Sequence, residues 1–175
     1  PLVVSDTTEL PSSESTELAF SKFAAHTQEE ALRILVAEDN LTNQRVIRQI
    51  LTRLNHHVEL ASDGFEAMEI LRNGEFDLVL MDIQMPGPDG YEVTANIRDG
   101  RCGSRNRNIP VVAVTAYAVL GDREKAREAG MLDHVSKPFT LEKLGRILQK
   151  VSSEKPKGGT SEPPGEDGAS AGGSG

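Results

Sequence analysis

The chain has 175 residues and a formal net charge of -8. This length fits one domain with its own apolar core plus flanking segments, and the acidity argues against a nucleic-acid-binding surface, which is normally basic. The single cysteine, Cys102, excludes an internal disulfide framework and is typical of a reducing compartment. No apolar stretch approaches the ~18 residues of a membrane span, so we expect no membrane contact by this segment.

Composition divides the chain into three parts. Residues 1–30 are rich in Ser, Thr and Glu and are predicted to be a mostly flexible linker, with a short helix near residues 18–25. Residues 31–152 are predicted to form the folded domain. Residues 153–175 are dominated by Gly, Pro, Ser and Glu, and they cannot bury enough apolar area to offset the entropy of ordering, so we expect disorder. The first residues lack a signal-peptide pattern. Because the chain begins with Pro1 and not with Met, we expect a fragment of a longer protein.

Apolar runs that are typical of buried strands alternate with helical patterns through the central part. The predicted strands cover Leu32–Ala37, His57–Ala61, Leu78–Met81, Val111–Val114 and Leu132–Val135. The predicted helices cover Leu41–Leu54, Gly64–Arg72, Tyr91–Ile97, Arg123–Ala129 and Leu141–Val151. The alternation predicts an α/β fold in which a five-stranded parallel sheet is doubly wound with five helices.

Helical spacing also predicts which side chains face the core. The inward residues expected of the first two helices are Val46, Ile47, Ile50, Leu51 and Leu54, then Phe65, Ala67, Met68 and Leu71. His56 and His57 are expected at the surface. Residues 99–108, which carry three arginines, are interpreted as a solvated loop, with docking on an acidic partner surface as the alternative.

Polar residues follow four of the predicted strands at the point where each strand finishes. Glu38 and Asp39 follow the first, Asp82 the third, Thr115 the fourth and Lys137 the fifth. In a parallel sheet these ends share one edge, which is where open α/β sheets bind ligands. The three acids, the hydroxyl and the amine are therefore expected to converge there.

Three neighbouring carboxylates repel one another unless a cation or protons relieve the repulsion. Oxygen ligands without His or Cys suit Mg²⁺, which commonly binds one or two carboxylates together with phosphate oxygens. A carboxylate such as Asp82 can also act as a nucleophile and form an aspartyl-phosphate. Lys137 and the Thr115 hydroxyl would then contact the phosphoryl group. Ordinary polar residues at loop starts are the plain alternative, which the joint occurrence of all five residues disfavours.

The joint pattern resembles the receiver domain of two-component signalling. The matching segments are Ile34 to Asn40, Met81 to Gly90, Val114 to Ala116 and Ser136 to Phe139. The resemblance covers roughly residues 31–152 and implies a flavodoxin-like sheet with strand order 2-1-3-4-5. It also implies that Asp82 is the phospho-acceptor and that Thr115 is the switch hydroxyl.

The resemblance assigns the remaining site residues as well. Asp39 and Asp82 would ligate Mg²⁺ with the backbone carbonyl of Gln84, and Glu38 would assist. Lys137 would bind the phosphoryl group, and its peptide bond to Pro138 would be cis.

One position departs from the family pattern. Three residues before the lysine the family commonly has Tyr or Phe, whose ring turns inward after phosphorylation, whereas this chain has His134. A histidine can still reorient, and its charge varies near neutral pH, so the output of the switch is expected to be tuned or weakened.

The Glu-Asp-Asn start and the run Met81 to Pro86 look most like the C-terminal receiver of a hybrid sensor histidine kinase. This implies that a phosphohistidine on a histidine kinase or a histidine phosphotransfer domain donates the phosphoryl group. The expected location is the cytoplasm, including the cytoplasmic part of a membrane-bound sensor kinase. The segment itself is then a phosphorylated signalling domain and not an enzyme.

Three other functions remain as alternatives. An aspartyl phosphatase would need a second Asp two residues after Asp82, where this chain has Gln84. A flavin-binding module would need a phosphate loop after the first strand, where Glu38 and Asp39 would repel phosphate. A receiver that acts only through phosphorylation-independent protein contacts is the third, and the intact site residues argue against it.

Overall fold

The computed structural model describes residues 17–22, 31–116 and 120–154. Its strands are β1 (Arg33–Ala37), β2 (His57–Ala61), β3 (Leu78–Asp82), β4 (Val111–Thr115) and β5 (Asp133–Ser136). Its longer helices are α2 (Leu41–Arg53), α3 (Gly64–Asn73), α4 (Gly90–Arg98), α5 (Leu120–Glu128) and α6 (Leu141–Glu154), and a 3-10 turn covers Ser104–Asn106. The predicted flexible linker and disordered tail fall almost entirely outside the described residues, apart from a helix over residues 17–22.

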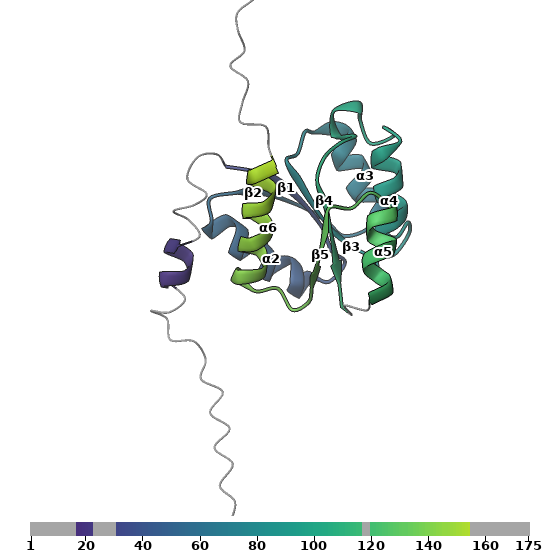
Figure 1. The fold of residues 1–175 in the computed structure, drawn as a ribbon. Helices are drawn as coiled ribbons and strands as arrows, with labels where there is room; N and C mark the ends of the chain where they lie inside the picture. Colours follow the sequence, from purple (N-terminus) through teal and green to yellow (C-terminus); the bar gives the residue numbers. More distant parts are fainter. Residues whose placement is uncertain (1–16, 23–30, 117–119, 155–175) are drawn as a thin grey trace, which may run out of the picture.

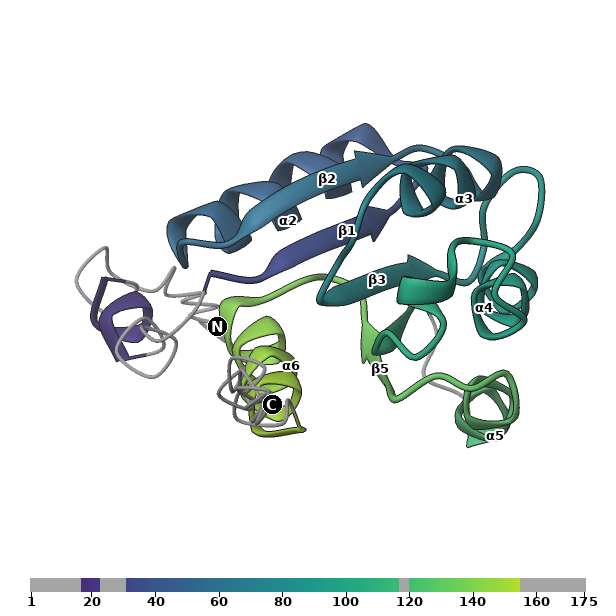
Figure 2. The same ribbon diagram turned by 90° about the horizontal axis from the view of Figure 1, so that it is seen from above.

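The five strands form one parallel sheet in the order β2-β1-β3-β4-β5 (Figure 1), which confirms the predicted fold and strand order. The sheet is parallel because each strand returns through a helix that crosses one face. Seen from above, α2 and α6 cover one face and α3, α4 and α5 cover the other (Figure 2). None of the helices in the described ranges is long and apolar enough to cross a membrane.

Two apolar layers hold the helices to the sheet. On one face the fully buried helix residues are Ile47 and Leu51 of α2 and Leu144, Leu148 and Val151 of α6. On the other face they include Ala67 and Leu71 of α3 and Val93 and Ile97 of α4. Strands β1 and β3 contribute side chains to both layers, so their sequences are apolar at nearly every position, as expected of strands covered on both faces.

Side-chain caps begin three helices at the same edge of the sheet. Asn40 accepts a hydrogen bond from the backbone nitrogen of Asn43 at 3.1 Å, and Asp63 caps α3 in the same way. Asp89 and Glu92 form a capping box at the start of α4. These caps fix where the chain leaves each strand end, and therefore where the polar residues of that edge lie.

Two residues that helical spacing placed inward are exposed. Phe65 is 64% exposed and Val46 is 40% exposed. A Cβ built on Gly87 would lie only 2.9 Å from the Phe65 ring, so this ring covers the loop between β3 and α4 instead of the core. The apolar stripe that helical spacing predicts on each of these helices is therefore wider than the part of the helix that the sheet covers.

Two further expectations about polar segments hold only in part. His57 is exposed as expected, whereas His56 is buried and its Nδ1 accepts a hydrogen bond of 3.0 Å from the backbone nitrogen of Leu32. The connection over residues 99–108 is partly buried, because Cys102 lies in the core and the Asn106 amide donates to the carbonyl oxygens of Leu71 and Gly74. The three arginines of this connection are exposed, as expected of a solvated loop.

Candidate functional site

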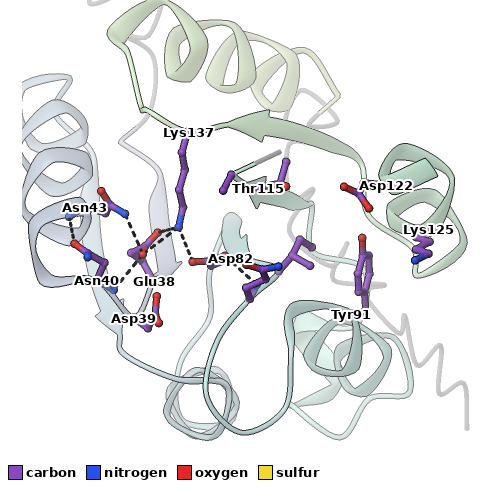
Figure 3. Close-up of a pocket in the computed structure, with 13 residues that line it drawn as sticks. Glu38, Asp39, Asn40, Asn43, Asp82, Tyr91, Thr115, Asp122, Lys125 and Lys137 are labelled. Atoms are coloured by element: carbon purple, nitrogen blue, oxygen red, sulfur yellow. Dashed lines mark hydrogen bonds and ion pairs between the residues drawn. The ribbon is translucent and has the colours of Figure 1, made fainter. Parts of the chain in front are cut away.

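A cleft of about 610 Å³ opens at the edge of the sheet where the strands finish (Figure 3). All five polar residues predicted to converge there line it, namely Glu38, Asp39, Asp82, Thr115 and Lys137. Glu38 and Asp39 follow β1, while Asp82 and Thr115 are the last residues of β3 and β4. The parallel register of neighbouring strands is what brings residues this far apart in sequence to one place.

The three acids form a compact oxygen cluster. One carboxylate oxygen from each of Glu38, Asp39 and Asp82 lies within 4.8 Å of the others. Glu38 is 1% exposed and Asp82 is 3% exposed, whereas Asp39 is open to solvent. Burial raises the pKa of Glu38 and the charge of Asp82 raises it further, against the hydrogen bond from Lys137. A cluster of this kind favours a hard cation, and its donor set fits Mg²⁺.

Lys137 supplies the positive charge that the buried acids face. Its Nζ lies 2.8 Å from Oδ2 of Asp82 and 2.9 Å from Oε2 of Glu38. Burial alone would lower the pKa of Lys137, but its hydrogen bonds to Asp82 and Glu38 outweigh burial and raise that pKa. Lys137 therefore stays charged and directs its ammonium at the oxygens of Asp82.

The backbone around the cleft is held by hydrogen bonds between neighbouring strand ends. The Lys137 nitrogen donates to the Thr115 carbonyl at 2.8 Å, which fixes the separation of β4 and the loop after β5. The Gln84 nitrogen donates to Oδ1 of Asp82 at 3.0 Å, which orients that carboxylate. Asp82 therefore has one oxygen held by the backbone of Gln84 and the other held by the ammonium of Lys137.

Three residues hold Glu38 in place, and this role was not predicted from the sequence for any of them. Oε1 of Glu38 accepts from the backbone nitrogen of Asn40 at 3.1 Å and from Nδ2 of Asn43 at 3.3 Å. Nε2 of Gln44 donates to the Glu38 carbonyl. The capping position of Asn40 could have pointed to its place beside the acids, whereas nothing in the sequence indicated the contacts of Asn43 and Gln44.

Hydrogen bonds from a lysine of α6 hold the loop that carries Lys137. Nζ of Lys143 donates to the carbonyl oxygens of Ser136 and Pro138 at 3.1 and 3.2 Å. The peptide bond between Lys137 and Pro138 is cis, which confirms the prediction. Lys143 was not singled out in the sequence, because a lysine in a first helical turn is usually solvated.

The far side of the cleft is lined by Tyr91 at the start of α4 and by Asp122 and Lys125 on α5 (Figure 3). Burial raises the pKa of the Tyr91 hydroxyl, and the charges of Asp122 and Asp89 raise it further. No pattern in the sequence relates these three residues to the acids of the cleft. Only the packing of α4 beside α5 brings them to the cleft.

His134 does not line the cleft. It lies on β5, half-buried in a separate hollow, where Nε of Arg123 is 3.2 Å from its Nε2 and Asp133 accepts a hydrogen bond from its backbone nitrogen. Strand register pairs it with Ala113 of β4, two residues before Thr115. The structure thus places His134 on the strand next to β4, with its side chain in contact with Arg123 of α5.

Comparison with known proteins gives a family and close relatives. Residues 34–149 match the family described as the response regulator receiver domain. The chain is 37% identical over 131 residues to the signal transduction histidine-protein kinase BarA of Escherichia coli, a match covering 75% of this chain and 14% of BarA. It is 36% identical over 120 residues to the response regulator DivK of Brucella anthropi, covering 69% of this chain and 93% of DivK. The chain therefore spans only a small part of the kinases it matches.

Solved structures agree with this family. The receiver domain of the sensor histidine kinase PA1611 from Pseudomonas aeruginosa, solved with a magnesium ion in its active-site cleft, is 40% identical, with a TM-score of 0.63 over 70% of this chain and 99% of that one. The receiver of yeast Ssk1, solved with the histidine phosphotransfer protein Ypd1, is 29% identical, with a TM-score of 0.64 over 70% of this chain and 90% of that one. This chain belongs to the response regulator receiver domain family, as its strand-end motifs indicate.

Proposed function

We propose that the cleft accepts a phosphoryl group on Asp82 and that this modification controls binding to other proteins. The observation that carries the proposal is the arrangement around Asp82, a buried carboxylate with one oxygen 2.8 Å from the Lys137 ammonium and two further acids within 4.8 Å. A nucleophilic carboxylate needs its charge retained, which the ammonium of Lys137 favours, and it needs the repulsion of an approaching phosphoryl group reduced, which a cation held by the three acids would achieve.

Glu38, Asp39 and Asp82 are the residues that would hold Mg²⁺, with the Gln84 carbonyl as a further ligand. Bound Mg²⁺ supplies positive charge that offsets the negative charge of a phosphoryl group entering beside these acids. The magnesium reported in the PA1611 receiver supports this assignment, because that relative shares 40% of its sequence with this chain. Asn40 and Asn43 would act by holding Glu38 in place, since both donate to its Oε1.

The transfer forms one bond and breaks one. A carboxylate oxygen of Asp82 attacks the phosphorus of a phosphohistidine, the P–N bond breaks, and the electron pair stays on the imidazole nitrogen, which then takes up a proton. Lys137 would move its ammonium from the Asp82 oxygen to a phosphoryl oxygen as charge develops there. The Thr115 hydroxyl would donate to another phosphoryl oxygen.

Phosphorylation of Asp82 would change the conformation of β4 and, through it, the outer surface of the domain. Movement of Thr115 toward the phosphoryl group would shift the end of β4. His134 pairs with β4 at Ala113 and contacts Arg123 of α5, so it would link this shift to α5. The two arrangements would differ in the surface formed by α5, β5 and α6, and the phosphoryl group would stabilise one of them.

The donor would be a histidine kinase or a histidine phosphotransfer domain. The similarity to BarA supports a hybrid histidine kinase as the parent protein, while the similarity to DivK fits a separate response regulator, so the kinase parent belongs to this proposal. The complex of the Ssk1 receiver with Ypd1 supports a phosphotransfer domain as the partner. A cytoplasmic location of this segment is part of the same proposal.

Intact mass spectrometry tests the proposal. The chain would be incubated with acetyl phosphate in Mg²⁺ or in EDTA, beside the variants Asp82→Asn and Asp39→Asn. We expect one added phosphoryl mass in the wild type with Mg²⁺, none for Asp82→Asn, and strongly slowed labelling in EDTA or for Asp39→Asn. Absence of labelling under conditions that label a known receiver would instead favour a receiver that acts by phosphorylation-independent contacts.

A further inference from the structure

A short helix over residues 17–22 lies beside α2, outside the sheet and its covering helices (Figures 1 and 2). We call this segment the lead-in helix. It precedes the receiver domain, and nothing in the proposed chemistry uses it. Within it Ala19 and Phe20 are half-buried, whereas Glu17, Ser21 and Lys22 are exposed and Leu18 is 77% exposed. One side of the helix therefore faces the domain and the other faces solvent.

Arg53, the last residue of α2, makes two contacts with the lead-in helix. Its guanidinium carbon lies 3.9 Å from the centre of the Phe20 ring, and the same group forms an ion pair with Glu17. Phe20 also packs against the apolar layer between the sheet and the helices α2 and α6. The Phe20 ring is therefore stabilised by a cation–π contact on one side and by the burial of apolar surface on the other.

These contacts are what hold the helix, because six residues are too few to form a stable helix in water. The ion pair contributes little, since the side chains of Arg53 and Glu17 are 41% and 69% exposed and solvent screens them. The packing of Phe20 and its contact with the guanidinium of Arg53 are therefore the main source of order in the lead-in helix.

We propose that the lead-in helix is a docking element, which fastens the upstream chain to the C-terminal end of α2. Asn40, which lines the phosphorylation cleft, caps the first end of α2, and Arg53 is at the other end. Thirteen helical residues separate the two ends by roughly 20 Å. The lead-in helix thus contacts α2 at the end opposite the one that borders the cleft.

Hydrogen exchange followed by mass spectrometry on the full chain tests this docking. The variants are Phe20→Ala, Arg53→Ala and Glu17→Gln, with Arg48→Ala as the control, because Arg48 is an exposed arginine on the same helix. Peptides covering residues 34–37 of β1, which are buried, report in the same experiment whether each variant keeps its fold.

In the wild type we expect the amides of residues 20–22 to exchange more slowly than those of an unstructured peptide, because the earlier amides of the helix have no carbonyl partner within it. Phe20→Ala should speed their exchange roughly tenfold and Arg53→Ala by a smaller factor, because the first removes both apolar burial and the cation contact. Glu17→Gln and Arg48→Ala should change it little. Exchange at the unstructured rate in the wild type, or equal protection in Phe20→Ala and wild type, would overturn the proposal.

Discussion

Lys137 is the cation that lets two carboxylates remain almost fully buried in the cleft. If it is replaced by alanine, Glu38 and Asp82 face each other without a counter-charge, and leaving a buried charge unpaired is strongly destabilising. We expect Lys137→Ala to lower the free energy of unfolding by roughly 3 kcal/mol in EDTA, and Mg²⁺ to restore part of that loss. Urea denaturation with and without Mg²⁺ measures both effects.

Lys125→Ala is the matched control for this prediction, because Lys125 lines the same cleft but is exposed. It should leave the free energy of unfolding nearly unchanged. If the Lys137 and Lys125 variants lost equal stability in EDTA, the buried ion pairs of Lys137 would not be the cause.

The burial of His56 gives the stability of the fold a dependence on pH. Burial lowers the pKa of His56 below its usual 6.5, and the charge of His57 lowers it further. As pH falls below about 6.5, the unfolded chain takes up a proton at this position before the folded chain does, so stability is complete above that pH and is lost below it. The wild type should therefore become less stable between about pH 7 and 5.

The variant His56→Asn isolates this effect, since an amide oxygen can still accept the hydrogen bond from the Leu32 nitrogen but does not titrate. Its free energy of unfolding should fall less steeply with acidification than that of the wild type. His57→Asn should flatten the slope only slightly, because burial, and not the charge of His57, is the larger cause of the lowered pKa of His56. Parallel slopes for all three proteins in urea denaturation would contradict the role given to His56.

At the scale of elements, the junction between β3 and α4 sets the shape of the cleft. A Cβ on Gly90 would lie 2.5 Å from the Asp82 carbonyl oxygen, which is backbone and cannot move aside cheaply. Gly90→Ala should push the first turn of α4 away from β3 and slow the labelling of Asp82 by acetyl phosphate. Gly121→Ala on α5, where a Cβ would meet nothing within 4 Å, should label at the wild-type rate. Equal labelling rates in the two variants would show that the close approach at Gly90 is not needed.

The elements also show what a sequence can and cannot predict. The strands β1, β3 and β4 were found because both of their faces are buried, so their sequences are continuous apolar runs. Helix α5 begins at Leu120, three residues before the predicted start, because its sequence is mostly charged and gives little apolar pattern. The prediction that Phe65 and Val46 face the core was wrong, because helical spacing defines an apolar stripe but not how much of that stripe the sheet covers.

At the scale of the whole molecule, the site was predictable to the extent that parallel topology determines it. Acids, a hydroxyl and a lysine at four strand ends must meet at one edge once the strands are parallel. The contacts that hold them, such as those of Asn43 and Lys143, depend on side-chain directions that no local pattern encodes. The buried His56 escaped prediction for the same reason, since its partner Leu32 lies 24 residues away.

The central claim is that Asp82, and not a neighbouring acid, receives the phosphoryl group. After labelling with acetyl phosphate and Mg²⁺, borohydride reduction converts a phosphorylated aspartate to homoserine, and peptide mass spectrometry then locates the change. The account predicts the modification at Asp82 alone. Modification of Glu38, of Asp39 or of a residue outside the cleft would contradict it.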